Sequence, residues 1–250
     1  MSTIQMNESM NKAFYDADSS TYDDSRWNSK GGEFTNRVQQ RVVHELCAKW
    51  RGQSVVEVGP GTARFSIPLL RQMNRLTLVD ISRGMLETAR KNISASGLSE
   101  GIDDLVTSTI YELPFEDSSF DHAISINVFN HLERPGEALK QLSRVIRSGG
   151  TVCFNYANLN SYYWLAAKKI NHRHEAHGQS VYSTWEIPSA MEKVIASARL
   201  KLVKRVGNVH MPRGLERFPV LPAIKALDSI SRNGPFNRLA PFHFCLCEKL

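Results

Sequence analysis

The sequence predicts an α/β fold built on one mostly parallel sheet of seven strands. Short apolar runs rich in β-branched residues alternate with helical stretches between about residues 55 and 155, and this alternation is typical of a parallel sheet. Two further apolar runs occur near the end of the chain. The 250 residues, of which 42% are hydrophobic and 22% charged, are enough for one substantial core. We therefore expect a single domain over residues 1–250.

The expected elements can be assigned in chain order. Residues 35–50 repeat apolar side chains at helical spacing and lead into an Arg51-Gly52 turn. Helical stretches such as 85–94 and 136–145 separate the strands that follow. The expected strands are residues 55–58, 76–79, 105–107, 123–127, 151–155, 200–209 and 242–248.

A turn with two glycines follows the first expected strand. Gly59 and Gly61 allow the backbone to approach a ligand closely before the next helix begins. The second strand ends at Asp80, about 20 residues further on, where a carboxylate can accept hydrogen bonds from both hydroxyls of a ribose. Arg64 occupies the place of the third glycine of a dinucleotide fingerprint, and the anionic Glu57 disfavours phosphates. The pattern therefore favours a cationic or neutral nucleoside.

Together with the sequence downstream, this turn resembles the class I S-adenosylmethionine-dependent methyltransferases. Residues 57–63 are similar to the glycine motif of that family and residues 80–86 to its ribose motif. The similarity continues in the order expected for the small-molecule branch, through the segments 113–121, 124–132 and 145–150. It implies a Rossmann-like sheet with helices on both faces and a reversed last strand. It also implies S-adenosyl-L-methionine as cofactor and direct methyl transfer to a small acceptor, such as a sugar, a lipid-linked glycan or a polyketide-like metabolite.

The resemblance also implies which residues hold the cofactor. Glu57 is expected to bind the ammonium group and Asp80 the ribose, while Ile81 and Met85 form an apolar wall for the adenine, although these two could simply be core residues. The expected cofactor-binding residues are Tyr22, Arg26, Glu57, Gly59, Pro60, Gly61, Asp80, Ile81, Met85, Thr109, Ile110 and Asn127.

One position departs from the family pattern. A carboxylate usually follows the third strand and accepts from the adenine amino group, but Thr109 stands there in this chain. The Thr109 hydroxyl and the backbone of Ile110 are the expected replacements, and Glu112 is an alternative acceptor.

The N-terminal part resembles the flexible cap that closes over the cofactor in this branch. Tyr15, Tyr22 and Arg26 are the candidate residues, because an aromatic face attracts a sulfonium and a closed site excludes water. The alternative is that these aromatics anchor a terminal helix. We expect the cap over residues 1–34, a lid or acceptor-binding insertion over 156–188 and a late insertion over 210–241.

His131, just after the fourth strand, is the candidate general base, because an imidazole titrates near neutral pH. Its alternative role is to cap the next helix or to bind backbone. Tyr156, His172, His174 and His177 are further candidates on the acceptor side. No metal is expected, because these histidines lack a suitable cluster of partners.

Charge is distributed unevenly along the chain. Residues 1–150 hold 17 Lys and Arg against 19 Asp and Glu, whereas residues 151–250 hold 14 against 6. The basic part fits an anionic acceptor or an acidic membrane surface, or equally a solvated basic face. No apolar run is long enough for a spanning helix, so we expect a cytoplasmic protein, with Cys47, Cys153, Cys245 and Cys247 reduced.

Two other functions remain open from the sequence. The basic C-terminal part would suit an RNA or DNA methyltransferase, although Asn127-Val128-Phe129-Asn130 stands where such enzymes carry an Asn-Pro-Pro-Tyr type motif. We therefore expect no nucleic-acid partner. The absence of a carboxylate at Thr109 would suit a non-catalytic cofactor-binding module. The sequence does not predict the oligomeric state.

Overall fold

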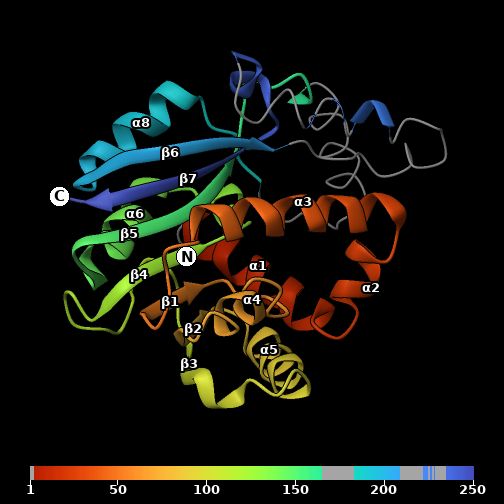
Figure 1. The fold of residues 1–250 in the computed structure, drawn as a ribbon, viewed down its shortest axis with the longest axis vertical. Coiled ribbons are helices and arrows are strands. Elements are labelled where there is room, and N and C mark those ends of the chain that lie inside the picture. The colour runs from red at the N-terminus through yellow and green to blue at the C-terminus, as the bar shows by residue number, and fades with distance from the viewer. Residues whose placement is uncertain (1–2, 165–182, 209–221, 225, 227, 229–234) are drawn as a thin grey trace.

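The seven expected strands form one sheet in the computed structural model, which describes residues 3–164, 183–208, 222–224, 226, 228 and 235–250. The strand order is β3-β2-β1-β4-β5-β7-β6. All neighbours from β3 to β5 pair in parallel, whereas β7 runs antiparallel to both β5 and β6. The mostly parallel sheet with a reversed last strand is thus confirmed (Figure 1). The strands are β1 (Ser54–Val58), β2 (Arg75–Asp80), β3 (Ile102–Thr107), β4 (Phe120–Ser125), β5 (Ile146–Ala157), β6 (Leu200–Asn208) and β7 (Phe242–Lys249).

Helices cover both faces of this sheet. On one face α3 packs against β6 and β7, while α4 and α5 pack against β2. On the other face α6 lies against β5, and α8 lies against α6 and β6. The two N-terminal helices pack on helices of the first face, α1 against α5 and α2 against α3 (Figure 1). The helices are α1 (Thr3–Asp18), α2 (Tyr22–Trp27), α3 (Lys30–Leu46), α4 (Ser66–Leu70), α5 (Arg83–Ala95), α6 (Pro135–Val145) and α8 (Pro188–Ser197).

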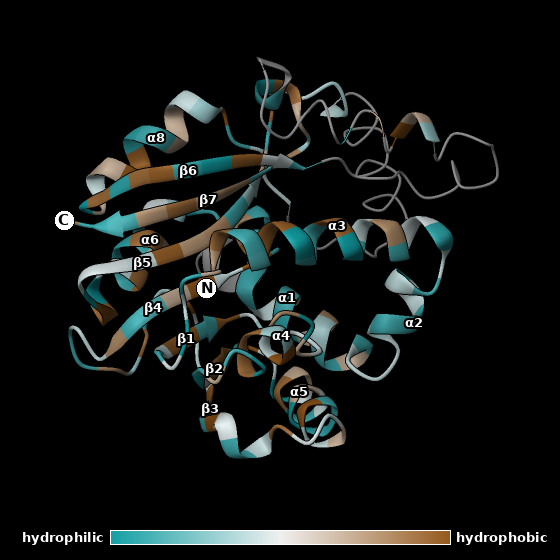
Figure 2. Ribbon diagram, in the orientation of Figure 1, coloured by the Kyte–Doolittle hydropathy of each residue, from teal (hydrophilic) through white to brown (hydrophobic). Residues whose placement is uncertain are grey.

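The alternation of side chains along β1 separates two apolar layers. Val55 belongs to the layer beneath α3, α4 and α5, whereas Val56 belongs to the layer beneath α6 and α8. Both valines are fully buried, as expected for a central strand with helices on each side. Figure 2 shows hydrophobic residues along the central strands and a mixture of hydrophobic and hydrophilic residues on α3. The four cysteines are free and buried.

Several boundaries differ from those expected from the sequence. α3 begins at Lys30 instead of residue 35, because the Ser29 side chain caps it by accepting a hydrogen bond from the Gly32 N–H at 3.0 Å. β5 begins at Ile146, whereas the expected strand begins at residue 151. Its pairing with β4 is interrupted after Ile146, where the register shifts, and Gly149 has a positive φ of +74° there.

The first 34 residues are helical throughout most of their length. α1, α2 and the first turn of α3 lie in this segment, where the sequence lacks a clean apolar stripe.

None of the helices in the described ranges is long and apolar enough to cross a membrane.

Candidate active site

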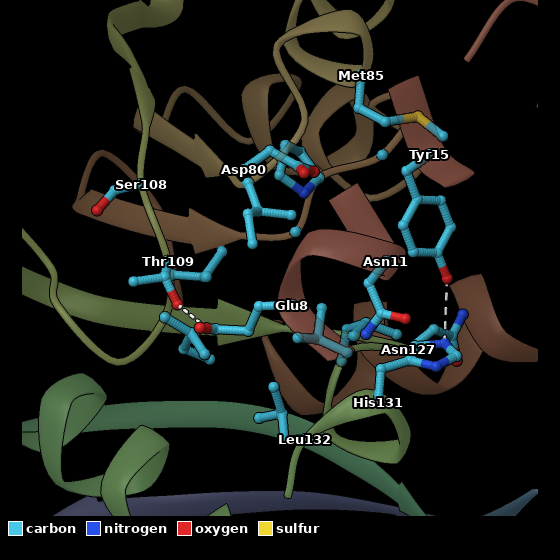
Figure 3. A pocket seen from close by; sticks show the side chains of 18 of the residues that line it. Glu8, Asn11, Tyr15, Asp80, Met85, Ser108, Thr109, Asn127, His131 and Leu132 are labelled. Carbon is cyan, nitrogen blue, oxygen red and sulfur yellow. Dashed lines mark hydrogen bonds between the residues drawn. The ribbon is translucent and has the colours of Figure 1, made fainter. Parts of the chain in front are cut away.

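A pocket opens at the carboxyl ends of the central strands, where α/β sheets bind ligands. It lies beside the ends of β1, β2 and β4 and the segment after β3, and α1 contributes to its wall (Figure 3). Its lining residues are Asn7, Glu8, Asn11, Tyr15, Tyr22, Val58, Gly59, Pro60, Gly61, Thr62, Arg64, Phe65, Asp80, Ile81, Met85, Ser108, Thr109, Ile110, Tyr111, Ile126, Asn127, Val128, His131, Leu132 and Glu133.

Two glycines shape the turn after β1. Gly59 has φ +75° and its N–H donates to the Val79 carbonyl at 2.7 Å. A Cβ at Gly59 would meet Cγ2 of Val128 at 2.3 Å, so no larger residue fits there. Gly61 has φ +55°, and a Cβ there would meet no atom within 4 Å. Since Gly61 lines the pocket, its bare backbone faces space that a ligand can fill.

Glu57 lies in β1, just behind the pocket wall. Its side chain is buried, and its Oε2 atom has no hydrogen-bond partner among the residues that the structure describes. Burial raises the pKa of this carboxyl to about 7. An unsatisfied carboxylate at this depth is costly for folding, so the position is better explained by a donor that a ligand supplies.

Arg64 lies close to this carboxylate and lines the pocket. Its guanidinium stacks over the rings of Trp27, at 4.0 Å, and Phe65, at 4.4 Å. It donates to the amide oxygens of Asn36 at 2.9 Å and Gln39 at 2.8 Å. Burial lowers the pKa of Arg64 to about 10. The side-chain hydrogen bonds of this cation thus go to neutral amides, while the carboxylates of Glu57 and Asp23 lie near enough to act on its charge.

Asp80 ends β2 at the centre of the pocket. Its carboxylate is 7% exposed, and its Oδ1 accepts from the Ser82 N–H at 2.9 Å. Burial raises the pKa of Asp80 to about 6. The backbone N–H groups of Gly61 and Ile81 also favour its charged form, and a carboxylate with about four lone-pair sites can accept further hydrogen bonds from ligand hydroxyls.

The segment after β3 forms one end of the pocket. Buried Ile110 and Met85 give it apolar walls. The Thr109 hydroxyl donates to Oε1 of Glu8, which α1 brings to this end, at 2.6 Å (Figure 3). Glu112, the alternative acceptor expected from the sequence, is exposed and does not line the pocket.

His131 lies at the opposite end, after β4. Its Nε2 is 3.1 Å from the Tyr15 hydroxyl and 3.0 Å from Nδ2 of Asn130 (Figure 3). Because an amide nitrogen only donates, Nε2 is the acceptor in this arrangement. Burial raises the pKa of Tyr15 well above its ordinary range, so the phenol stays protonated and can also donate.

Asn127 lines the pocket with its backbone in the left-handed region, at φ +62°. Its N–H donates to Oδ1 of Asn155 at 2.6 Å, and the Asn155 amide donates back to Oδ1 of Asn127 at 2.9 Å. Nδ2 of Asn127 donates to Gln39 at 3.2 Å. This pair of amides holds a strained residue at the end of β4, a feature of functional sites.

Polar contacts attach α1 to the sheet edge. Oδ1 of Asp16 accepts from the Ser82 hydroxyl at 2.5 Å and from the Gly84 N–H at 3.3 Å, at the beginning of α5. The Ser82 hydroxyl in turn caps α5 by accepting from the Met85 N–H at 3.1 Å. Asn7 donates to Glu133. The helix therefore lies across the pocket with anchors on both sides.

The structure brings most of the expected site residues together. The pocket is lined by Tyr22, Gly59, Pro60, Gly61, Asp80, Ile81, Met85, Thr109, Ile110, Asn127 and His131.

Three expected residues lie elsewhere. Glu57 lies behind the wall, and Arg26 stacks over Tyr22 at 4.2 Å and pairs with Asp18 at 3.3 Å instead of lining the pocket. Tyr156 is buried in the core against His243. His172, His174 and His177 lie outside the described residues. In the described ranges no three His, Cys, Asp or Glu residues are grouped to hold a metal ion.

Glu8, Asn11 and Arg64 are among the pocket residues that the sequence analysis does not identify as site residues. Glu8, Asn11 and Tyr15 share one face of a helix by their spacing, and this was the available signal on α1. Arg64 was interpreted only as a departure from a dinucleotide motif, and its sequence neighbours gave no sign of the acceptors that α3 provides.

Comparison with known proteins finds a methyltransferase domain in this chain. The model of the methyltransferase domain matches residues 56–154. The chain is 29% identical over 188 residues to a phosphatidylethanolamine N-methyltransferase of Cereibacter sphaeroides, covering 75% of this chain and 87% of that enzyme.

Two further similarities agree with this match. A ubiquinone/menaquinone biosynthesis C-methyltransferase of Roseobacter denitrificans is 32% identical over 46% of each chain, so this chain spans about half of its length. The crystal structure of an S-adenosylmethionine-dependent methyltransferase of Thermotoga maritima, described as a possible histamine N-methyltransferase, has the same fold. Its TM-score is 0.68, with 20% identity over 95% of this chain and 99% of that one. These findings support the class I S-adenosylmethionine-dependent methyltransferase family, and the chain is an enzyme that uses this cofactor.

Proposed function

We propose that this enzyme transfers a methyl group from S-adenosyl-L-methionine to a small-molecule acceptor by direct displacement. The observation that carries the proposal is the order of groups along the sheet edge. Glu57 lies in β1 and Arg64 lies in the segment that follows it, Asp80 lies at the end of the neighbouring β2, and apolar walls lie after β3. The amino-acid, ribose and base portions of one cofactor follow each other in the same order.

The residues fit the charges of this cofactor. The Oε2 of Glu57 lacks a donor and would accept from the ammonium group, directly or through water. The Arg64 guanidinium would bind the carboxylate of the same amino-acid portion. The bare backbone at Gly61 leaves room for the ligand, and Asp80 would accept from the ribose hydroxyls. A phosphate would face Glu57 and Asp80, so a pyrophosphate fits poorly.

The chemistry needs positioning more than proton transfer. The sulfonium supplies an already activated methyl group, and its carbon bonds to the acceptor as the sulfur–carbon bond breaks. The protein holds the acceptor in line and excludes water, for which α1 and the rings of Tyr15 and Tyr22 are placed. We propose His131 as the group that takes a proton from an acceptor that carries one. Its Nε2 can do so once Tyr15 and Asn130 release it.

The class of acceptor is proposed from the chain and its relatives together. Sugars, lipid-linked glycans and polyketide-like metabolites remain the candidates, and the similar enzymes extend the range to a phospholipid amine and a quinone ring. The charge excess of residues 151–250 supports an anionic acceptor or an acidic lipid surface. A cytoplasmic location stays a prediction.

Two measurements test this function. Calorimetry with S-adenosylhomocysteine is expected to show one site per chain. Incubation of metabolite extracts with cofactor labelled at the methyl group is expected to place label on a small molecule. Label on RNA or DNA, with retention on nucleic acid that falls with salt, would instead support the nucleic-acid alternative. Binding without any transfer of label would contradict the proposed reaction.

A further inference from the structure

The end of the pocket after β3 is the place where a nucleoside base would lie. The sheet order places β2 between β1 and β3, so a ribose at Asp80 has the β1 turn on one side and the segment 108–110 on the other. The charged groups Glu57 and Arg64 occupy the β1 side. The β3 side has the apolar walls of Met85 and Ile110 that suit a flat ring.

A carboxylate reaches this end from a distant part of the sequence. Glu8 is 101 residues from Thr109, yet its Oε1 accepts from the Thr109 hydroxyl at 2.6 Å and both residues line the pocket. Figure 3 shows Glu8 pointing from α1 toward Thr109. The hydrogen bond uses one of about four lone-pair sites of the carboxylate. Glu8 is thereby oriented and can still accept from a ligand.

Thr109 alone is a poor acceptor for the base edge. Its hydroxyl proton is committed to Glu8, and the Tyr111 N–H approaches its oxygen at 3.4 Å. A carboxylate forms a stronger hydrogen bond with an amino group than a neutral hydroxyl does. Among the described residues that line this end, Glu8 is therefore the acceptor of greatest strength for an exocyclic amino group.

We propose that the Glu8 carboxylate accepts a hydrogen bond from the 6-amino group of the adenine and that Thr109 positions Glu8 for this contact. The inference rests on the proposed cofactor site and adds a specificity-determining residue to it. Because Glu8 belongs to α1, it can bind the base only while α1 is docked against the pocket. Recognition of the cofactor and closure of the helix over the pocket are then one event.

The test compares two ligands that differ only at this amino group. Calorimetry measures the Kd of S-adenosylhomocysteine and of its analogue with hydrogen in place of the 6-amino group. The wild-type protein is expected to prefer the amino ligand by about tenfold or more. The preference is expected to fall to about twofold or less in Glu8→Ala. Glu8→Gln, which keeps an acceptor oxygen, is expected to lie between the two.

The ratio of the two Kd values separates recognition from a structural role. Undocking of α1 alone would weaken both ligands equally and leave the ratio unchanged. Met10→Ala, on the exposed side of the same helix, is the matched control and should keep the wild-type ratio. An unchanged ratio in Glu8→Ala would overturn the assignment, and so would a wild-type protein without preference.

A parallel variant keeps the two levels of the argument apart. Asp80→Ala should weaken both ligands if the proposed cofactor site is right. If it does so while Glu8→Ala keeps the wild-type ratio, only the role of Glu8 fails. If wild-type protein binds neither ligand, or Asp80→Ala binds both normally, the cofactor site fails and Glu8 fails with it.

Discussion

Buried charges at the pocket have a cost that the fold alone does not explain. Glu57 and Asp80 are 2% and 7% exposed, and burial raises the pKa of each carboxyl to about 7 and about 6. The Glu57 Oε2 remains without a partner. Groups of this kind destabilise a protein unless a ligand satisfies them. The two buried carboxylates therefore support a ligand that brings a cation to Glu57 and a diol to Asp80.

Substitution of Asp80 or Gly61 tests the site most directly. Asp80→Ala removes the proposed ribose acceptor and should weaken S-adenosylhomocysteine binding at least about tenfold. Gly61→Val should abolish binding, because its side chain would enter the pocket and its φ of +55° disfavours a β-branched residue. Calorimetry gives both affinities. Asp104→Ala, on the exposed side of β3, is the control, and normal binding in both site variants would refute the assignment.

His131 can be tested by its effect on rate and pH dependence. If it takes a proton from the acceptor, His131→Asn should lower kcat about 100-fold and remove the acidic limb of the pH profile, with little change in the Kd of the cofactor. His44→Asn, at an exposed histidine of α3, should behave as wild type. A variant with an unchanged kcat and pH profile would leave His131 a positioning or capping residue.

The residues found from sequence are those whose role is local. Gly59, Gly61 and Asp80 act next to a strand end, and a strand end is visible in a run of apolar letters. Glu8 and Arg64 act through partners 101 and about 28 residues away in the chain, Thr109 and Asn36. Contacts of that range depend on how α1 and α3 pack, and this information is not present in a local pattern.

At the level of elements, α1 depends on α5 for its position. The Asp16 carboxylate accepts from Ser82 and Gly84 at the beginning of α5, where the helix dipole also favours a negative charge. The aromatic ring of Tyr15 adds a contact with His131, with ring centroids 6.0 Å apart. The helix is thus attached to α5 and to the segment after β4 by a few polar and aromatic contacts.

Asp16→Ala should loosen this attachment. The loss of a charged acceptor at a helix N-terminus costs about 1–2 kcal/mol, so hydrogen exchange in α1 should become about fivefold or more faster. Exchange in β1 and β4 should not change. Asp24→Ala, in the exposed helix α2, serves as the control. Equal protection of α1 in both variants would show that Asp16 does not hold the helix.

The order of strands and helices was predictable, whereas the N-terminal helices were not. Strands β1 to β5 are marked by apolar runs between turn residues, and the sheet follows from their alternation with helices. α1 has few apolar residues on any face, so its stability comes from tertiary contacts. The sequence accordingly favoured a flexible cap and left a terminal helix as the alternative, and the structure has helices there.

For the whole molecule, pH dependence separates the site from the scaffold. Burial lowers the pKa of His122 and His243 to about 4. Between about pH 4 and 6.5 the unfolded chain binds more protons at these histidines, so they make stability rise with pH. Glu57 and Asp80 act in the opposite sense, because their raised pKa values let the folded chain bind more protons. Between pH 6.5 and about 7.5 the unfolded chain still loses protons from these histidines, so they raise stability while the carboxylates lower it. A variant of Glu57 is needed to separate the two effects.

The contribution of Glu57 to the stability of the protein without ligand should therefore fall as pH rises from 6.5 to 8.5. With a pKa of about 7 in the folded state and 4.5 as its ordinary value, Glu57 contributes a fall of about 1 kcal/mol over this range. Glu57→Gln removes this titration. Between pH 6.5 and 8.5, its free energy of unfolding in urea should therefore fall by about 1 kcal/mol less than that of the wild-type protein. Glu116→Gln, at an exposed glutamate, should follow the wild-type curve. If the Glu57→Gln curve also runs parallel to wild type, the carboxylate is already ionised at pH 6.5, and it then has no need of a ligand ammonium group.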